Sequence, residues 1–88
     1  MPPPAPTQAE FARAVELHRR GQLNDAESLC RSVLRVEPRH FGACYMLGII
    51  ALQRGNLPAA LTEMDRALRI DPNAAPAHRD RGVVLARL

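Results

Sequence analysis

The 88-residue sequence lacks tryptophan and contains only two phenylalanines and one tyrosine. Its interior must therefore be built from leucine, alanine, valine, isoleucine and methionine, a set in which helix formers dominate. Lysine is also absent, so all twelve basic side chains are arginine, and they form no continuous basic run. A net charge of +3 without a basic stripe or interleaved aromatic residues is weak support for a nucleic-acid partner.

Cysteine and long apolar runs are scarce. Cys30 and Cys44 are too few for a secreted disulfide framework, and both occupy positions where a helical pattern requires small apolar residues, so we expect buried reduced thiols. The opening MPPPAP has neither the basic start nor the apolar core of a secretory signal. As a helix, the apolar run 41–52 would span about 18 Å, short of the hydrocarbon layer of about 30 Å. These features predict a cytoplasmic protein without a membrane span.

Nothing in the residue pattern indicates catalysis. His18, His40 and His78 are scattered, and the sequence contains no HExxH or CxxC motif and no glycine-rich phosphate loop. Ser28 and Ser32 fall within a helical pattern rather than on a nucleophile elbow. We therefore predict that the chain is not an enzyme and needs no metal and no cofactor.

One segment occurs twice, at a spacing of 34 residues. GQLNDAESLCRSVLRVEP at 21–38 and GNLPAALTEMDRALRIDP at 55–72 share a first glycine, a last proline and several leucine, alanine and arginine positions. The glycine suits a tight turn and the proline ends a helix, so one helix lies between them in each copy. Internal repetition at this period indicates stacked structural units.

The apolar periodicity predicts an all-α fold. Ala26, Cys30 and Val33 fall on one helical face, and Ala60, Met64 and Ala67 repeat that stripe. We expect a disordered proline-rich tail at 1–6 and helices at about 7–20, 24–37, 41–54, 58–71 and 75–88. At the start of the first helix, the Thr7 hydroxyl is predicted to act as the N-cap, with Glu10 completing a capping box.

The 34-residue pattern resembles the tetratricopeptide repeat, most closely in residues 41–74. Six family positions match: Leu47, Gly48, Gly55, Ala60, Ala67 and Pro72. The resemblance implies antiparallel helical hairpins stacked as a short right-handed α-solenoid, with repeats at 7–40 and 41–74. Residues 75–88 would be the first helix of a third repeat or a C-terminal capping helix. Arg13 and Arg81 depart from the family, which prefers leucine there.

In tetratricopeptide repeats the first helix of each repeat lines a concave groove that holds peptides or partner helices. The residues that the resemblance places in this groove are Gln8, Phe11, Val15, His18, Arg19, Tyr45, Ile49, Leu52, Gln53, Arg79, Val83 and Arg87. Independently, the i, i+4, i+7 spacing places two sets of these residues each on one helical face: Phe11, Val15 and His18, and Tyr45, Ile49 and Leu52. The family's carboxylate clamp and asparagine ladder are both missing, so the groove is expected to be apolar, with arginines at one end.

These observations predict a non-catalytic protein–protein interaction module that binds an apolar or amphipathic peptide or helix. We also expect a homo-oligomer, formed through the apolar groove or the stack ends, because two repeats are fewer than the roughly three that stable arrays need. One alternative is the N-terminal part of a larger enzyme, such as a glycosyltransferase or sulfotransferase, whose repeats position protein substrates. An RNA-binding helical repeat has the least support.

Overall fold

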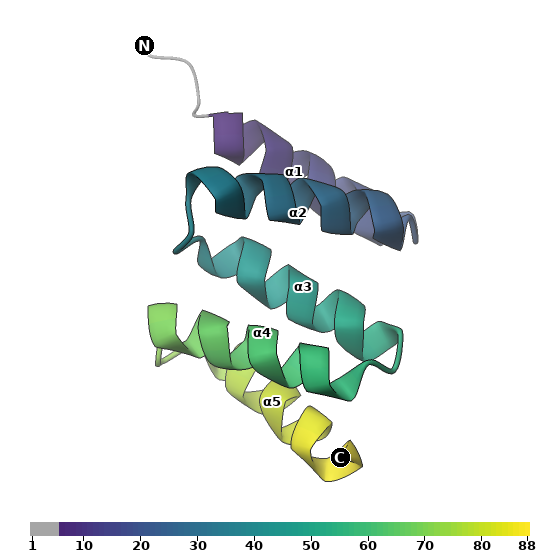
Figure 1. Cartoon of the computed structure of the whole chain (residues 1–88), viewed down its shortest axis with the longest axis vertical. Helices are drawn as coiled ribbons and strands as arrows, with labels where there is room; N and C mark the ends of the chain where they lie inside the picture. Colours follow the sequence, from purple (N-terminus) through teal and green to yellow (C-terminus); the bar gives the residue numbers. More distant parts are fainter. Residues whose placement is uncertain (1–5) are drawn as a thin grey trace.

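The computed structural model describes residues 6–88, which form five helices and no strand. Consecutive helices run antiparallel and stack one above another (Figure 1). They are α1 (Pro6–Arg19), α2 (Leu23–Val36), α3 (Phe41–Gln53), α4 (Leu57–Ile70) and α5 (Ala75–Arg87). The predicted all-α fold of stacked helical hairpins is therefore confirmed.

The start of the chain differs from the sequence-based expectation. Residues 1–5 of the predicted tail lie outside the described residues, and Pro6 is already the first residue of α1, where a proline forfeits no helical hydrogen bond. Thr7 therefore lies inside the helix, almost fully buried, and its hydroxyl donates a hydrogen bond to Glu37 Oε1 at 2.6 Å. Glu10 Oε2 is buried with no hydrogen-bond partner. The predicted Thr7–Glu10 capping box is wrong, because the Thr7 hydroxyl is used to tie α1 to the end of α2.

The two hairpin turns owe their shape to glycine. Gly21 and Gly55 have φ angles of +78° and +75°, a left-handed conformation that other residues adopt only with strain. After Gly21, the amide of Gln22 donates to the Leu17 carbonyl at 2.9 Å, and the same bond recurs from Asn56 to Ala51. These bonds satisfy the last carbonyls of α1 and α3 and reverse the chain.

Small side chains let the helices pack closely. The largest core cluster joins the two hairpins through these buried residues: Ala14, Cys30, Val33, Leu34, Ala43, Cys44, Leu47 and Ala67. Gly48 of α3 lies against α4, because a Cβ added there would be 2.9 Å from Met64 Cε. Gly48 thus leaves room for the Met64 side chain between α3 and α4.

Both cysteines lie in this core as free thiols. Burial raises the pKa of Cys30 to about 11, and burial also raises the pKa of Cys44. Because a thiolate is the reactive form, both side chains are held in the unreactive thiol state at neutral pH. The expectation of buried reduced cysteines is confirmed.

Residues 6–88 contain no helix with both the length and the apolar content needed to cross a bilayer.

Candidate functional site

The predicted groove residues come from α1, α3 and α5, and two polar contacts join these helices. His18 Nε2 of α1 lies 2.8 Å from Gln53 Oε1 of α3. One repeat further on, the Tyr45 hydroxyl of α3 donates a hydrogen bond to Asp80 of α5. In both pairs the partners are 35 residues apart in the chain, one more than the repeat length. Side chains of successive first helices therefore meet on one surface, which we call the α1/α3/α5 face.

The middle of the α1/α3/α5 face is apolar. Val15, Ile49 and Leu52 are half-buried, and Val83 of α5 is 37% exposed. Leu52 also packs against the cluster of Ala51, Ala60 and Val84, so part of its surface serves the core. These side chains leave an apolar strip that is partly open to solvent.

Polar groups surround this strip. Gln8, Arg19, Gln53 and Arg87 are exposed. Arg19 contacts Glu16 at 3.0 Å, and the Arg79 guanidinium lies 3.7 Å from the Asp80 carboxylate with a side chain that is 72% exposed. The α5 end of the face thus carries two exposed arginines.

Phe11 is used mainly in packing between the two hairpins. Its ring centroid lies 4.8 Å from that of His40. A Cβ added to Gly42 would be 2.6 Å from Phe11 Cζ, so the ring already fills the space above this glycine. Phe11 is therefore less available to a partner than its predicted groove position implied.

Tyr45 is held from two sides. Its ring stacks on Phe41 at 5.6 Å between centroids, and its hydroxyl is bonded to Asp80. Burial, followed by the Asp80 bond, raises the pKa of Tyr45 to about 12. Asp80 was not among the predicted site residues, although its 35-residue spacing from Tyr45 equals the spacing between His18 and Gln53, which were both predicted.

This raised pKa predicts a loss of stability at alkaline pH. The folded state favours neutral Tyr45, so its contribution is complete below the unfolded pKa of about 10 and lost as the pH rises through about 12. Because Tyr45 is the only tyrosine, ultraviolet absorbance of the tyrosinate reports its ionisation directly. We expect a midpoint well above 10, and a shallower alkaline decline of the unfolding free energy in Tyr45→Phe. A tyrosinate midpoint near 10 would contradict the Asp80 contact.

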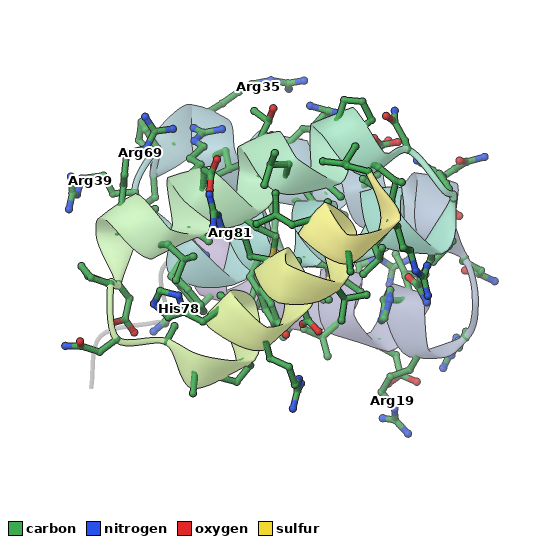
Figure 2. The ribbon with its side chains drawn as sticks, turned by 90° about the horizontal axis from the view of Figure 1, so that it is seen from below. Arg19, Arg35, Arg39, Arg69, His78 and Arg81 are labelled. Atoms are coloured by element: carbon green, nitrogen blue, oxygen red, sulfur yellow. The ribbon has the colours of Figure 1, made fainter. Side chains whose placement is uncertain are left out.

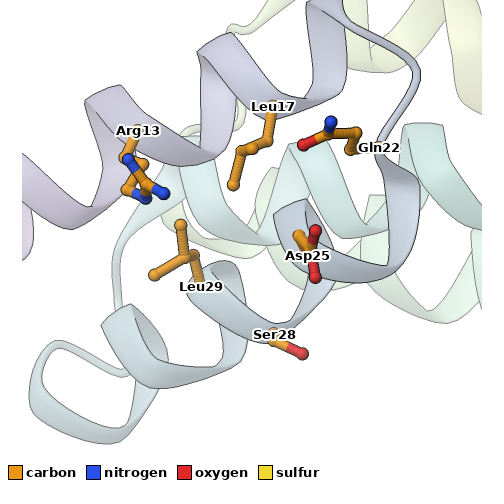
Figure 3. Close-up of a pocket in the computed structure, with 6 residues that line it drawn as sticks. All are labelled: Arg13, Leu17, Gln22, Asp25, Ser28 and Leu29. Carbon is orange, nitrogen blue, oxygen red and sulfur yellow. The ribbon is translucent and has the colours of Figure 1, made fainter.

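Two hollows lie elsewhere. One, of about 380 Å³, lies between α1 and α2 (Figure 3), where it is lined by Arg13, Leu17, Gln22, Asp25, Ser28 and Leu29. The other, of about 110 Å³, lies among α2, α3 and α4, where Arg54 donates to Glu27 at 3.0 Å and thereby lowers the pKa of that carboxyl. None of the twelve predicted groove residues lines either hollow. The prediction of a groove therefore depends on the α1/α3/α5 face itself.

The described residues 6–88 contain no group of three metal-ligating side chains.

Comparison with known proteins identifies the family of the repeat. Residues 11–75 match the family model described as a tetratricopeptide repeat. A human protein described as FK506-binding protein-like is 33% identical over 90 residues, covering 97% of this chain and 25% of that protein.

Among solved structures, a mutant O-GlcNAc transferase of Thermobaculum terrenum matches with a TM-score of 0.87 and 33% identity. The match covers 90% of this chain and 15% of the transferase. This chain thus spans a quarter or less of the length of either relative. Since the family match covers well over half of the sequence, the chain belongs to the tetratricopeptide repeat family.

Proposed function

We propose that this chain is a protein-interaction module whose α1/α3/α5 face binds an apolar or amphipathic helix. Tetratricopeptide repeats generally serve protein interaction and are typically non-catalytic. The observation that supports the proposal most is the strip of Val15, Ile49 and Leu52, which is apolar yet only half-buried. A helix with apolar residues at i, i+3 or i+4 and i+7 would cover such a strip.

Charge at the α5 end of the face selects among such helices. Arg79 and Arg87 are exposed there, and Arg87 makes no ion pair with any of residues 6–88. An acidic residue near one end of the bound helix would meet these guanidinium groups. The preferred ligand is therefore an amphipathic helix with an apolar stripe and an acidic end.

A second copy of the chain is one source of such a covering element. Leu85 of α5 and Leu88, which follows this helix, are 45% and 61% exposed, so further apolar side chains are open to solvent there. Small repeat arrays gain stability by covering such surfaces. We include self-association through the face or the stack ends in the proposal.

Ile49→Arg is the decisive variant, because it adds a charge at the centre of the strip. The probe is a dye-labelled amphipathic peptide of about fifteen residues with one leucine stripe and a terminal glutamate. We expect fluorescence anisotropy to show binding that Ile49→Arg weakens about tenfold or more. Light scattering should show any oligomer dissociating in the same variant.

Val36→Arg is the matched control. Val36 is 69% exposed at the end of α2, away from the α1/α3/α5 face, and receives the same charge. It should leave both peptide affinity and oligomer mass unchanged. Equal loss in both variants, or no binding and no oligomer in the unmodified chain, would refute the proposal.

The match to a transferase supports a second candidate role, in which these repeats belong to a larger enzyme and position its protein substrates. An antibody against residues 41–74 would distinguish the two roles on an immunoblot of the source cells. A band near the 9.7 kDa of this sequence favours the free module, and a much larger band favours the enzyme.

We also propose a cytoplasmic location. Cys30 and Cys44 are free thiols in the core, as expected in a reducing compartment. Fluorescent tagging of the intact protein tests this, and accumulation outside the cytoplasm would contradict it.

A further inference from the structure

Four arginines lie along one edge of the stack, where α2 and α4 both end. Arg35 and Arg69 occupy the last turns of these two helices, and Arg39 follows in the α2–α3 loop (Figure 2). Arg66 of α4 donates a hydrogen bond to the Pro38 carbonyl at 3.3 Å, which places it beside that loop. We call this set of Arg35, Arg39, Arg66 and Arg69 the arginine edge. Figure 2 shows Arg35, Arg39 and Arg69 on the opposite side of the molecule from Arg19 of α1.

Most arginines elsewhere in the chain form ion pairs. Six of the twelve form ion pairs: Arg19, Arg20, Arg31, Arg54, Arg79 and Arg81. Within residues 6–88 none of the four arginines of the edge pairs with a carboxylate. The edge therefore holds four guanidinium groups that form no ion pair within the described residues.

Three acidic residues close to the edge in sequence form bonds with groups outside it. Glu37 accepts the Thr7 hydroxyl at 2.6 Å, and Asp71 accepts the backbone amide of Asn73 at 3.1 Å. Asp65 binds Arg81 of α5 at 2.5 Å. Each of these carboxylates bonds a group outside the edge, and none forms an ion pair with one of the four arginines.

Helix stability explains only part of this arrangement. A cation in the last turn interacts favourably with the helix dipole, which accounts for one arginine at the end of α2 and one at the end of α4. Arg39 lies in the loop, and Arg66 precedes the last turn of its helix. The positive charges of these two arginines repel those of Arg35 and Arg69, and neither of them forms an ion pair with any of residues 6–88.

We propose that the arginine edge binds an acidic protein segment, rich in aspartate and glutamate, separately from the α1/α3/α5 face. Planar guanidinium groups recognise carboxylates through paired hydrogen bonds. The exposed Val36, next to Arg35 in α2, adds an apolar contact for one leucine or valine of that segment. Single-stranded nucleic acid fits less well, because stacking on bases requires aromatic side chains and all three in the chain are packed at α1 and α3.

The test uses a dye-labelled peptide of glutamate and aspartate with a single leucine, titrated against the full chain by fluorescence anisotropy. Arg35→Glu/Arg69→Glu is expected to weaken binding about tenfold or more, since two guanidinium contacts become repulsive. The affinity of the unmodified chain should fall steeply between about 20 mM and about 300 mM salt.

Arg13→Glu/Arg20→Glu is the matched control, because it makes the same change of net charge on α1 and the turn after it. The peptide affinity of that variant should stay within about threefold of the affinity of the unmodified chain, because a local contact at the edge is left intact. Ile49→Arg should also retain binding, which separates this site from the proposed helix-binding face.

Three results would overturn the inference. Equal weakening by the two double variants would mean that only net charge matters. If no peptide binding is measurable at low salt, the edge does not bind an acidic segment. Tighter binding of a labelled polyuridine strand, lost in Arg35→Glu/Arg69→Glu, would assign the edge to nucleic acid instead.

Discussion

Replacing Ile50 with alanine is expected to lower the free energy of unfolding by about 2–5 kcal/mol, a large part of the stability of a small domain. Ile50 is 1% exposed and packs with Leu17 of α1 and Ala26 of α2, so its side chain fixes the second hairpin to the first. Removing three carbons leaves a cavity bounded by three helices. The small neighbour Ala26 cannot expand to fill it.

Ile49→Ala is the internal control for this experiment. Ile49 is the preceding residue of the same helix, loses the same atoms and gains the same helix propensity, yet it is only half-buried. We expect Ile49→Ala to lower the free energy of unfolding, measured with urea or heat, by no more than about 1.5 kcal/mol. The same variant should weaken peptide binding. Similar losses of stability in the two variants would mean that Ile49 is a core residue and that the apolar strip is not available to a partner.

This pair of isoleucines shows where the sequence is insufficient. The repeat spacing and the glycine and proline positions predict the helices, because each turn needs Gly21 or Gly55 at positive φ and each hairpin needs small residues at its contacts. Phe41 to Leu52 is apolar nearly all round, however, so periodicity alone cannot separate Ile49 from Ile50. Their different burial depends on the position of α1 and α2.

Contacts between residues that are far apart in the sequence were the least predictable feature. The local sequence predicts that Thr7 caps a helix, but its hydroxyl donates a hydrogen bond to Glu37, thirty residues away. Asp80 was missed for the same reason, since its partner Tyr45 is in the preceding repeat. The arginines at the ends of α2 and α4 come close to one another only when the hairpins stack. Short-range patterns carry no information on such distances.

The second large effect is expected from two glycine-to-alanine changes of opposite sign. At Gly42 a new Cβ would lie 2.6 Å from Phe11 Cζ and 2.9 Å from Phe11 Cε2, closer than atoms tolerate. The ring would have to leave its contact with His40, so we expect a net loss of about 1–3 kcal/mol. At Gly82 of α5 nothing lies within 4 Å, so alanine should stabilise the helix by about 0.5–1 kcal/mol.

Urea unfolding of both variants measures this difference, and a double-mutant cycle identifies its cause. If the Phe11 ring is the obstacle, Gly42→Ala should become neutral or stabilising in a Phe11→Ala background, because the clash is then absent. The Gly82→Ala effect should be the same in both backgrounds, since Gly82 has no neighbour within 4 Å. Stabilisation by Gly42→Ala in the unmodified chain would contradict the packing of Phe11 between the hairpins. The ring would then be free to reach a ligand on the α1/α3/α5 face, as the sequence alone predicts for Phe11.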